Sequence, residues 1–253
     1  MKIAIITGAS SGIGREYVRQ VSEREEIDEI WVVARREDRL SELKEAIKTP
    51  IVPICADLRK KSDSEKIRRM LADRSPDVRV LVNAAGYGRF EAIENTTEYD
   101  AEGMVELNIN ALTRITQYCL PYMSEGARIF MLGSRSGFHP VPYIAVYAAT
   151  KAYVVSFARS LGVELRSRGI RVIAVCPGWV RTEFIDKASE NDGVIVYYNS
   201  FVTAEQVVTR SYKDMLRGKD VSVCGFSTRV QLLLAKLLPH RFVMWIWCKQ
   251  QKK

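Results

Sequence analysis

The segment KIAIITGASSGIG, residues 2–14, decides the fold of this chain. Its first six residues are apolar and rich in β-branched side chains, which is typical of a short strand buried in a parallel sheet. The glycines allow a tight chain reversal and close approach of a phosphate, and the helix expected at about 12–25 offers that anion free amides and its positive end. A glycine cluster alone would indicate only an ordinary turn, but strand, glycines and helix in this order are what a nucleotide-binding unit requires. The segment therefore predicts a cofactor site that includes Gly8, Ser10, Ser11, Gly12, Ile13 and Gly14.

The same alternation of strand and helix continues along the chain. Short apolar runs predict strands at 2–7, 29–34, 51–55, 78–82, 128–133, 170–175 and 221–223. Helical patterns lie at about 12–25, 37–48, 62–73, 97–124, 145–168 and 203–217. This order predicts an α/β fold with a single doubly wound parallel sheet, the Rossmann fold, with helices on both faces. We assign residues 1–225 to this domain and residues 226–253 to a short helical extension of it.

Polar or small residues follow several of the predicted strands. The carboxyl ends of the strands lie along one edge of such a sheet and bind the ligand. We expect Asp57 either to accept a hydrogen bond from an adenine amino group or to cap a turn. Small residues after the fourth strand would let the cofactor lie against it. These strand ends add to the predicted cofactor site Asp57, Leu58, Asn83, Ala84, Ala85 and Gly86, and they bring Ser134 and Pro177 to the same edge.

The end of the second predicted strand indicates which dinucleotide binds. Dinucleotide folds carry an acid there that accepts hydrogen bonds from the adenosine ribose. This chain instead has Ala34 followed by Arg35 and Arg36, and guanidinium groups suit a ribose 2′-phosphate. If the chain had no glycine loop, Arg35 and Arg36 would simply be solvated residues at the start of a helix. Because the glycine loop predicts a dinucleotide site, the two arginines favour NADP(H) as the cofactor, with NAD(H) as the alternative.

Tyr147 and Lys151 lie four residues apart in the helix predicted at 145–168, so their side chains project from the same face. The unperturbed pKa of a phenol is about 10, and a nearby ammonium lowers that pKa toward the range useful for proton transfer. In isolation such a pair more often lies on a helix surface without a function. A catalytic role for Tyr147 and Lys151 is favoured because other residues of the chain form an ordered set of motifs with them.

That set resembles the motifs of the short-chain dehydrogenase/reductase family. The matches cover residues 1 to about 185 and are Thr7-Gly8-x-x-x-Gly12-x-Gly14, Asn83-Ala84-Ala85-Gly86, Asn108, Ser134, Tyr147-x-x-x-Lys151 and Pro177-Gly178-x-x-x-Thr182. The resemblance implies that Tyr147 exchanges a proton with a carbonyl or alcohol oxygen and that Ser134 binds this oxygen. It implies that Lys151 lowers the pKa of Tyr147 and holds the nicotinamide ribose, and that Asn108 holds a water linked to Lys151. The nicotinamide carboxamide would be fixed by the segment that contains Pro177, Gly178, Val180 and Thr182.

Two positions depart from the family pattern. Ala84 stands where the family often has a second asparagine, and this change keeps the small size that the site needs. Ser11 stands where members that prefer NADP often carry a basic residue. The cofactor prediction therefore depends on Ala34, Arg35 and Arg36.

The composition excludes several other classes of protein. A hydrophobic content of 47% is too high for a disordered chain. The five cysteines are scattered and form no CxxC pair, which argues against disulfides and against a metal site and fits a reducing cytoplasm. Met1 and Lys2 lead directly into the first strand, so we expect no signal peptide. The net charge of +8 suggests an anionic partner, but no signature of nucleic-acid recognition accompanies it.

The C-terminal part predicts an apolar substrate. The resemblance places a substrate lid at about 183–202, and its apolar and aromatic residues favour a ketone or a secondary alcohol with apolar substituents. After Asp220 there is no acidic residue, and the apolar runs are interrupted by cations and by Pro239, so they do not form a spanning helix. We expect residues 226–253 to cover the substrate pocket or a subunit interface. Two amphipathic helices lying on a membrane surface are the alternative.

The prediction is thus a cytoplasmic NADP(H)-dependent oxidoreductase acting on a small apolar carbonyl or alcohol. The resemblance implies a homodimer or homotetramer built on the 97–124 and 145–168 helices. One alternative is a regulatory protein that binds NADP(H) without turnover, although Ser134, Tyr147 and Lys151 would then be unnecessary. Another is a membrane-peripheral protein that uses its basic tail.

Overall fold

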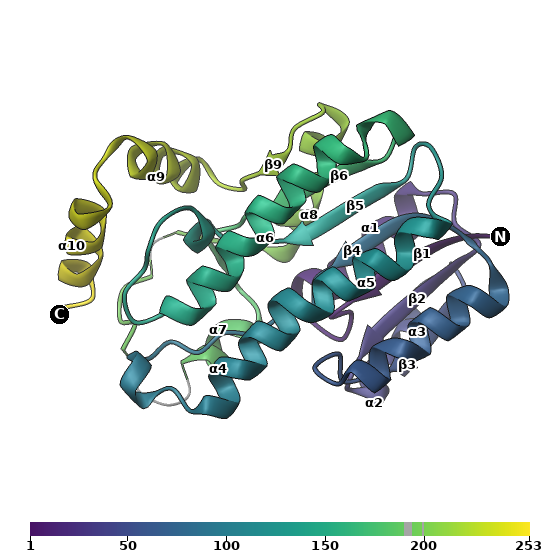
Figure 1. Ribbon diagram of the computed structural model, residues 1–253, viewed down its shortest axis with the longest axis horizontal. Helices are drawn as coiled ribbons and strands as arrows, with labels where there is room; N and C mark the ends of the chain where they lie inside the picture. Colours follow the sequence, from purple (N-terminus) through teal and green to yellow (C-terminus); the bar gives the residue numbers. More distant parts are fainter. Residues whose placement is uncertain (190–193, 199) are drawn as a thin grey trace.

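A seven-stranded parallel sheet forms the centre of the protein (Figure 1). The computed structural model describes residues 1–189, 194–198 and 200–253. The sheet order is β3-β2-β1-β4-β5-β6-β9, and each neighbouring pair is parallel, which confirms the predicted doubly wound sheet. The strands are β1 (Lys2–Thr7), β2 (Glu29–Ala34), β3 (Ile51–Cys55), β4 (Asp77–Asn83), β5 (Arg128–Leu132), β6 (Arg171–Val175) and β9 (Val221–Ser222).

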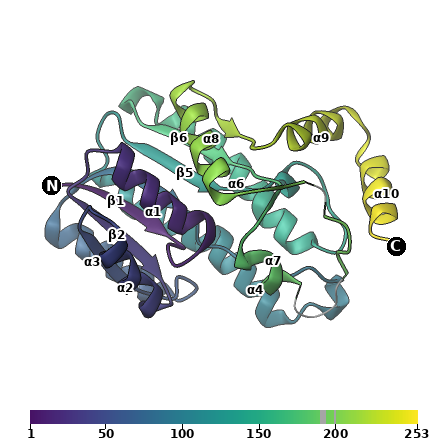
Figure 2. The ribbon, with the colours of Figure 1, turned by 180° about the vertical axis from the view of Figure 1, so that it is seen from behind.

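Helices cover both faces of the sheet, and this double cover explains why the strands are continuous apolar runs. One face packs on α1 (Gly12–Arg24), α2 (Glu37–Ala46) and α8 (Ala204–Leu216), as Figure 2 shows. The other face packs on α3 (Lys61–Arg74), α5 (Leu112–Cys119) and α6 (Ala145–Glu164). Alternate residues of β1 divide between the two cores. Ile3 and Ile5 contribute to one core, and Ala4 and Ile6 contribute to the other.

The chain reverses its direction across the sheet between β1 and β4. From β1 the chain runs outward through β2 to β3 and then returns to β4 on the other side of β1. This change of direction opens a crevice at the carboxyl end of β1. The Thr7 hydroxyl fixes the two strand ends, because its Oγ1 accepts hydrogen bonds of 3.1 Å from the backbone amides of both Ala84 and Ala85. The glycine loop after β1 and the small residues after β4 are thereby held together.

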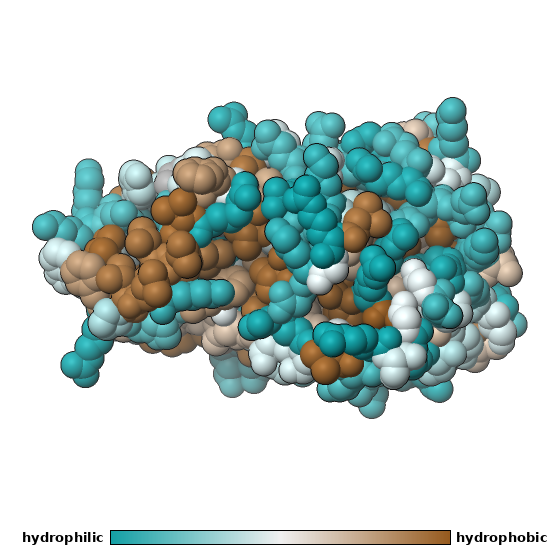
Figure 3. All heavy atoms as spheres, turned by 90° about the horizontal axis from the view of Figure 1, so that it is seen from above, coloured by the Kyte–Doolittle hydropathy of each residue, from teal (hydrophilic) through white to brown (hydrophobic). Residues whose placement is uncertain are grey.

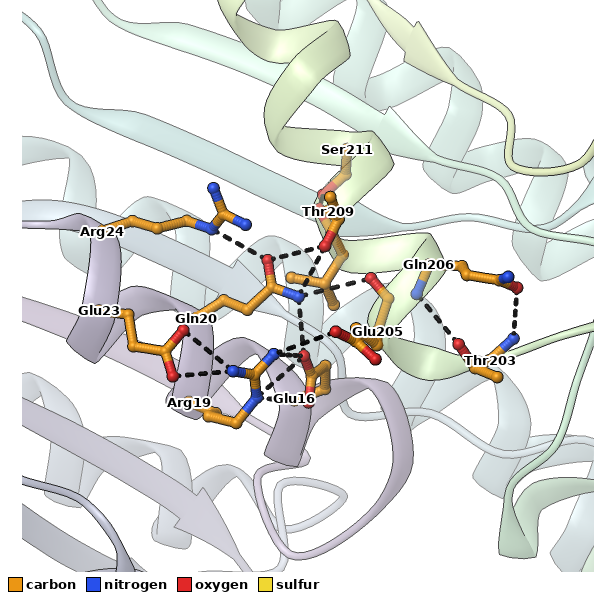
Figure 4. Close-up of polar contacts among 11 residues, drawn as sticks. Glu16, Arg19, Gln20, Glu23, Arg24, Thr203, Glu205, Gln206, Thr209 and Ser211 are labelled. Carbon is orange, nitrogen blue, oxygen red and sulfur yellow. Dashed lines mark hydrogen bonds and ion pairs between the residues drawn. The ribbon is translucent and has the colours of Figure 1, made fainter.

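Polar contacts join α1 to α8 (Figure 4). The buried Gln20 side chain donates to Thr209 Oγ1 at 3.0 Å and to Glu16 Oε1 at 2.7 Å, and its Oε1 accepts from Arg24 Nε at 3.0 Å. A capping box formed by Thr203 and Gln206 begins α8. These contacts fix the helix that leads into β9 and from there into the C-terminal tail.

The predicted helix at 97–124 is not one uniform helix. It consists of α4 (Glu98–Val105), a π-helical turn η2 (Glu106–Ala111), α5 and a 3-10 turn η3 (Leu120–Tyr122). Apolar spacing does not distinguish these hydrogen-bond patterns. Asn108 lies within the π-helical turn, and such turns are frequent at functional sites.

Several short elements surround the crevice. Strands β7 (Trp179–Val180) and β8 (Phe201–Val202) form a separate parallel pair, which the sequence did not predict. The predicted lid at 183–202 contains α7 (Glu183–Ala188) and the whole of β8, while residues 190–193 and 199 of it lie outside the described residues. The other short elements here are η1 (Ile93–Asn95) and η4 (Arg135–Phe138), whereas η5 (Arg166–Arg168) lies at the opposite edge of the sheet, before the amino end of β6.

The tail forms two helices at one end of the sheet, drawn in yellow in Figure 1 and Figure 2. They are α9 (Phe226–Leu237) and α10 (His240–Gln250), and Pro239 separates them. Thr228, Leu232 and Ala235 are buried on one face of α9. Within the described parts of the chain, every helix is too short or too polar to cross a membrane.

Candidate active site

A cavity of about 530 Å³ lies at the carboxyl edge of the sheet. It collects nearly all of the site residues predicted from the sequence, although these come from distant parts of the chain. Only Asn83 and Asn108 of that set lie behind the cavity wall. The predicted residues that line it are Gly8, Ser10, Ser11, Gly12, Ile13, Gly14, Arg35, Arg36, Asp57, Leu58, Ala84, Ala85, Gly86, Ser134, Tyr147, Lys151, Pro177, Gly178, Val180 and Thr182.

The glycine loop leaves the first turn of α1 open to an anion. Ser11 is the N-cap residue, but its side chain makes no capping hydrogen bond, and the first turn contains no acid. Gly8 and Gly12 have φ angles of 69° and 54°, which favour glycine. A Cβ atom on Gly14 would lie 2.2 Å from the Gly8 carbonyl oxygen, so the helix approaches the loop closely only because this residue is glycine. Free amides at the positive end of a helix fit the pyrophosphate of a dinucleotide.

Arg36 is already engaged by two other side chains at the end of the cavity next to β2. Its Nη1 lies 2.7 Å from Glu183 Oε2, and its Nε and Nη2 donate to Ser10 Oγ at 3.3 and 3.0 Å. The neighbouring Arg35 is exposed. The Arg36 guanidinium lowers the pKa of the Glu183 carboxyl. Glu183, in the first turn of α7, was not among the predicted site residues, and no local sequence pattern connects it with Arg36.

Asp57 faces Arg59 rather than standing free at the end of β3. Arg59 Nη2 lies 2.8 Å from Asp57 Oδ2, and Arg59 Nε lies 3.1 Å from Oδ1. These hydrogen bonds lower the pKa of the Asp57 carboxyl. Leu58 is buried beside it. The carboxylate therefore lines the cavity as part of an ion pair that also fixes the turn.

Asn83 and Asn108 hold the cavity wall from behind. The buried Asn83 amide donates to Thr116 Oγ1 at 3.0 Å, which ties β4 to α5. Asn108 Nδ2 donates to the Tyr87 carbonyl at 2.9 Å and to Thr150 Oγ1 at 3.0 Å, while its Oδ1 accepts from the Tyr87 amide at 3.1 Å. Asn108 thus joins the loop after β4 to helix α6.

Tyr147 and Lys151 are buried together on α6, with the Lys151 Nζ 5.6 Å from the centre of the Tyr147 ring. Lys151 Nζ donates to the Leu132 carbonyl at 2.7 Å, at the end of β5. Burial lowers the pKa of Lys151 to about 8, because removal of water disfavours the ammonium form. A Cβ atom on Gly86 would lie 3.4 Å from Lys151 Nζ and 2.9 Å from Asn108 Oδ1, so both groups adjoin this glycine.

Burial shifts the pKa of Tyr147 in the opposite direction to that of Lys151. It raises the pKa of Tyr147 well above its ordinary value, and a hydrogen bond with Ser134 opposes this rise. Lys151 was expected to lower this pKa. Removal of water from the phenolate is the dominant influence in the structure, and it acts in the opposite direction.

Ser134 follows β5 and faces the Tyr147 hydroxyl. Its Oγ accepts hydrogen bonds from the Ser136 amide at 3.2 Å and from the Ser136 hydroxyl at 2.9 Å. The Ser134 hydroxyl hydrogen is therefore directed toward Tyr147, with which Ser134 shares a hydrogen bond. Ser136 supports this orientation and was not predicted as a site residue.

The far end of the cavity is apolar and aromatic. The Phe90 ring centre lies 6.2 Å from that of Tyr147 and 5.8 Å from that of Trp179, in edge-on arrangements. The Phe184 ring centre lies 5.5 Å from that of Tyr147. Trp247 of α10 also lines the cavity, and its Nε1 donates to the Pro142 carbonyl at 3.0 Å. Through Trp247 the tail reaches the pocket, which is one of the two positions expected for it, although Trp247 itself was not singled out from the sequence.

Comparison with known proteins finds dehydrogenases and oxidoreductases both by sequence and by structure. Residues 2–193 match the family model described as short chain dehydrogenase. An uncharacterized oxidoreductase of Staphylococcus epidermidis is 33% identical over 183 residues, which are 72% of this chain and 79% of that protein. A short-chain dehydrogenase from Sphingobium yanoikuyae, solved in complex with NADPH, is 27% identical with a TM-score of 0.79 over 94% of both chains. The bulky-bulky ketone specific alcohol dehydrogenase from Comamonas testosteroni is 27% identical with a TM-score of 0.74, over 94% of this chain and 92% of that one.

Proposed function

The chain belongs to the short-chain dehydrogenase family of oxidoreductases, and on this basis we propose that it reduces apolar ketones with NADPH, or oxidises the matching secondary alcohols with NADP⁺. Tyr147 is the general acid and base of the proposed reaction. The observation that carries the proposal is the position of the buried Tyr147–Lys151 pair. It lies in the cavity that connects the glycine loop of α1 to the aromatic pocket.

The protein contributes a proton and a polar site for the substrate oxygen. In reduction the Tyr147 O–H bond breaks and the proton moves to the carbonyl oxygen, while the Ser134 hydroxyl donates a hydrogen bond to the same oxygen as negative charge develops on it. The Lys151 ammonium stabilises the resulting phenolate until a proton from solvent replaces the one lost. A bound nicotinamide supplies the hydride for reduction, or accepts it for oxidation.

Several groups fit the proposed cofactor NADP(H). The open first turn of α1 suits the pyrophosphate, and Arg35 and Arg36 suit the 2′-phosphate. Lys151 would hold the nicotinamide ribose, and the segment from Pro177 to Thr182 would hold the carboxamide. Asn108 supports this set by fixing the loop after β4 against α6.

The proposed substrate class follows from the other end of the cavity. The aromatic rings of Phe90, Trp179, Phe184 and Trp247 form much of its wall, so apolar substituents on both sides of the reacting carbon would be buried there. Similarity to an alcohol dehydrogenase specific for bulky-bulky ketones supports the same class. We further propose a cytoplasmic location and a homodimer or homotetramer built on helices α4, α5 and α6.

The test is oxidation of NADPH in the presence of a panel of apolar ketones, with NADH in parallel. Replacement Tyr147→Phe should lower kcat by roughly a hundredfold to ten-thousandfold while NADPH still binds, since that is the contribution of a positioned proton donor. The control is Tyr153→Phe, which alters a tyrosine of the same helix that contacts Thr113 outside the cavity. Turnover that survives in Tyr147→Phe would show that another group donates the proton. NADPH binding without turnover on any ketone would instead favour a regulatory protein.

A further inference from the structure

The outer face of helix α9 is apolar and exposed. Phe226 and Leu237 have 78% and 73% of their surface in contact with solvent, and Val230 and Leu233 are exposed between them. These four residues are spaced four, three and four residues apart, so they share one side of the helix. The opposite side packs on the protein through Thr228, Leu232 and Ala235.

Helix α10 continues this surface. Phe242 and Trp245 are exposed, and their rings stack with centres 5.7 Å apart and planes inclined by 17°. Lys249 Nζ lies 5.0 Å from the centre of the Trp245 ring. Trp247 points the other way, into the cavity wall. Figure 3 shows the result, because apolar side chains gather over the end of the molecule formed by α9 and α10.

The charge of this segment has one sign. Residues 221–253 contain no aspartate or glutamate, and their six lysines and arginines carry six of the eight net positive charges of the chain. Residues 1–220 are thus close to neutral. The six cations are Arg229, Lys236, Arg241, Lys249, Lys252 and Lys253.

We propose that the outer face of α9 and α10 is a docking surface for an anionic phospholipid bilayer. The exposed apolar side chains would enter the boundary between headgroups and acyl chains, where aromatic side chains such as Phe242 and Trp245 are favoured. The six cations would attract the lipid phosphates. A second copy of the chain is a poorer partner for this face, because its equivalent face would bring six more positive charges against the first six.

Docking to a bilayer would also explain why the outer face of the tail is apolar, which closure of the cavity by its inner face does not require. The inner face of α10 already closes the cavity through Trp247, and exposed apolar residues contribute nothing to that closure. A bilayer on the outer face would lie next to the apolar end of the cavity. The docking itself does not depend on the proposed reaction, so it stands or falls by binding alone.

The experiment is co-sedimentation of the full-length protein with vesicles of phosphatidylcholine alone and with vesicles that also contain phosphatidylglycerol. The protein should bind the anionic vesicles at least about tenfold more tightly. High salt should weaken this binding, because mobile ions screen charges at a surface. The double variant Leu233→Ser/Leu237→Ser should lose binding by a similar factor. So should Arg229→Gln/Lys236→Gln, which keeps the apolar face.

The matched control is Leu216→Ser at the end of α8, since Leu216 has 64% of its surface exposed but lies outside the tail. It should bind vesicles like the unaltered protein, and NADPH binding should be retained in all variants as a check of the fold. Equal sedimentation with both kinds of vesicle, or none with the anionic kind, would overturn the proposal. Light scattering measures the oligomeric state of the same variants and tests whether this face instead binds a second copy of the chain. If the Leu233/Leu237 variant breaks a dimer and vesicle binding is absent throughout, the face joins two copies of the chain.

Discussion

Lys151 is the residue whose ionisation the structure ties most directly to activity. Its ammonium is buried, hydrogen-bonded to the Leu132 carbonyl, and its pKa is lowered to about 8 by desolvation. The same burial keeps Tyr147 protonated, because it raises the pKa of that phenol. A rise in pH above neutrality therefore first removes the charge of Lys151 and leaves the phenol intact.

We predict that kcat/KM for NADPH falls above pH 8. This parameter reports ionisations of the free enzyme, in which Lys151 is cationic below its pKa and neutral above it. The value should be constant between pH 6 and about pH 7.5 and then decrease about tenfold per pH unit. Measurement of initial rates across this range tests the prediction. Lys151→Arg, which stays charged, should be slower but should lose the decrease. A profile that is flat to pH 10 in the unaltered enzyme would contradict the prediction.

Among the structural elements, the strands were predicted most accurately. Their apolar runs at 2–7, 29–34 and 51–55 match β1, β2 and β3. In β1 and β2 the run is continuous because both faces of the strand are buried. The helix predicted at 97–124 was right in position but wrong in its uniformity. A π-helical turn changes backbone hydrogen bonds without changing which residues are apolar, so η2 has no signature in the sequence pattern. The pair β7–β8 was missed because each strand has only two residues.

An ion pair connects helix α7 to the end of the cavity next to β2. Thr182 caps the helix by accepting from the Phe184 amide, and Glu183 in its first turn reaches Arg36 beyond β2. The Glu183 carboxylate thus occupies the guanidinium group proposed to bind the 2′-phosphate. Glu183 and that phosphate would compete for the same donors, and a dinucleotide without the phosphate would not enter this competition.

Glu183→Gln should therefore bind NADPH more tightly, by roughly fivefold, since an exposed ion pair contributes up to about 1 kcal/mol. Its affinity for NADH should remain unchanged. The control is Asp186→Asn, which removes one negative charge from an exposed position of the same helix without an ion pair to Arg36. Titration of each cofactor by calorimetry measures the difference. The prediction would fail if Glu183→Gln raised the affinities for NADH and NADPH equally, or if Asp186→Asn had the same effect as Glu183→Gln. Either result would show that the negative charge of α7 acts through its overall electrostatic field and not through the ion pair with Arg36.

Across the whole molecule, what could be predicted depends on how each side chain reaches the site. Ser10, Asp57 and Ser134 follow parallel strands, and the sheet brings all such positions to one edge. Glu183 and Trp247 reach the same cavity from α7 and α10, through chain paths that no local periodicity specifies. Both faces of α10 carry tryptophan, so the sequence alone does not tell that Trp247 points inward and Trp245 outward.

The end of the cavity proposed for the cofactor and the end proposed for the substrate are consequently built by different parts of the molecule. The sheet edge forms the first, and the tail completes the second through Trp247. We predict that Trp247→Ala raises KM for an apolar ketone about tenfold, which corresponds to a loss of about 1.4 kcal/mol in binding. The dissociation constant for NADPH should be unchanged, because the glycine loop and β2 lie at the other end. Phe242→Ala, on the outer face of α10, should alter neither quantity. If Trp247→Ala weakens NADPH as much as the ketone, the tail supports the whole cavity, and the two ends are one cooperative unit.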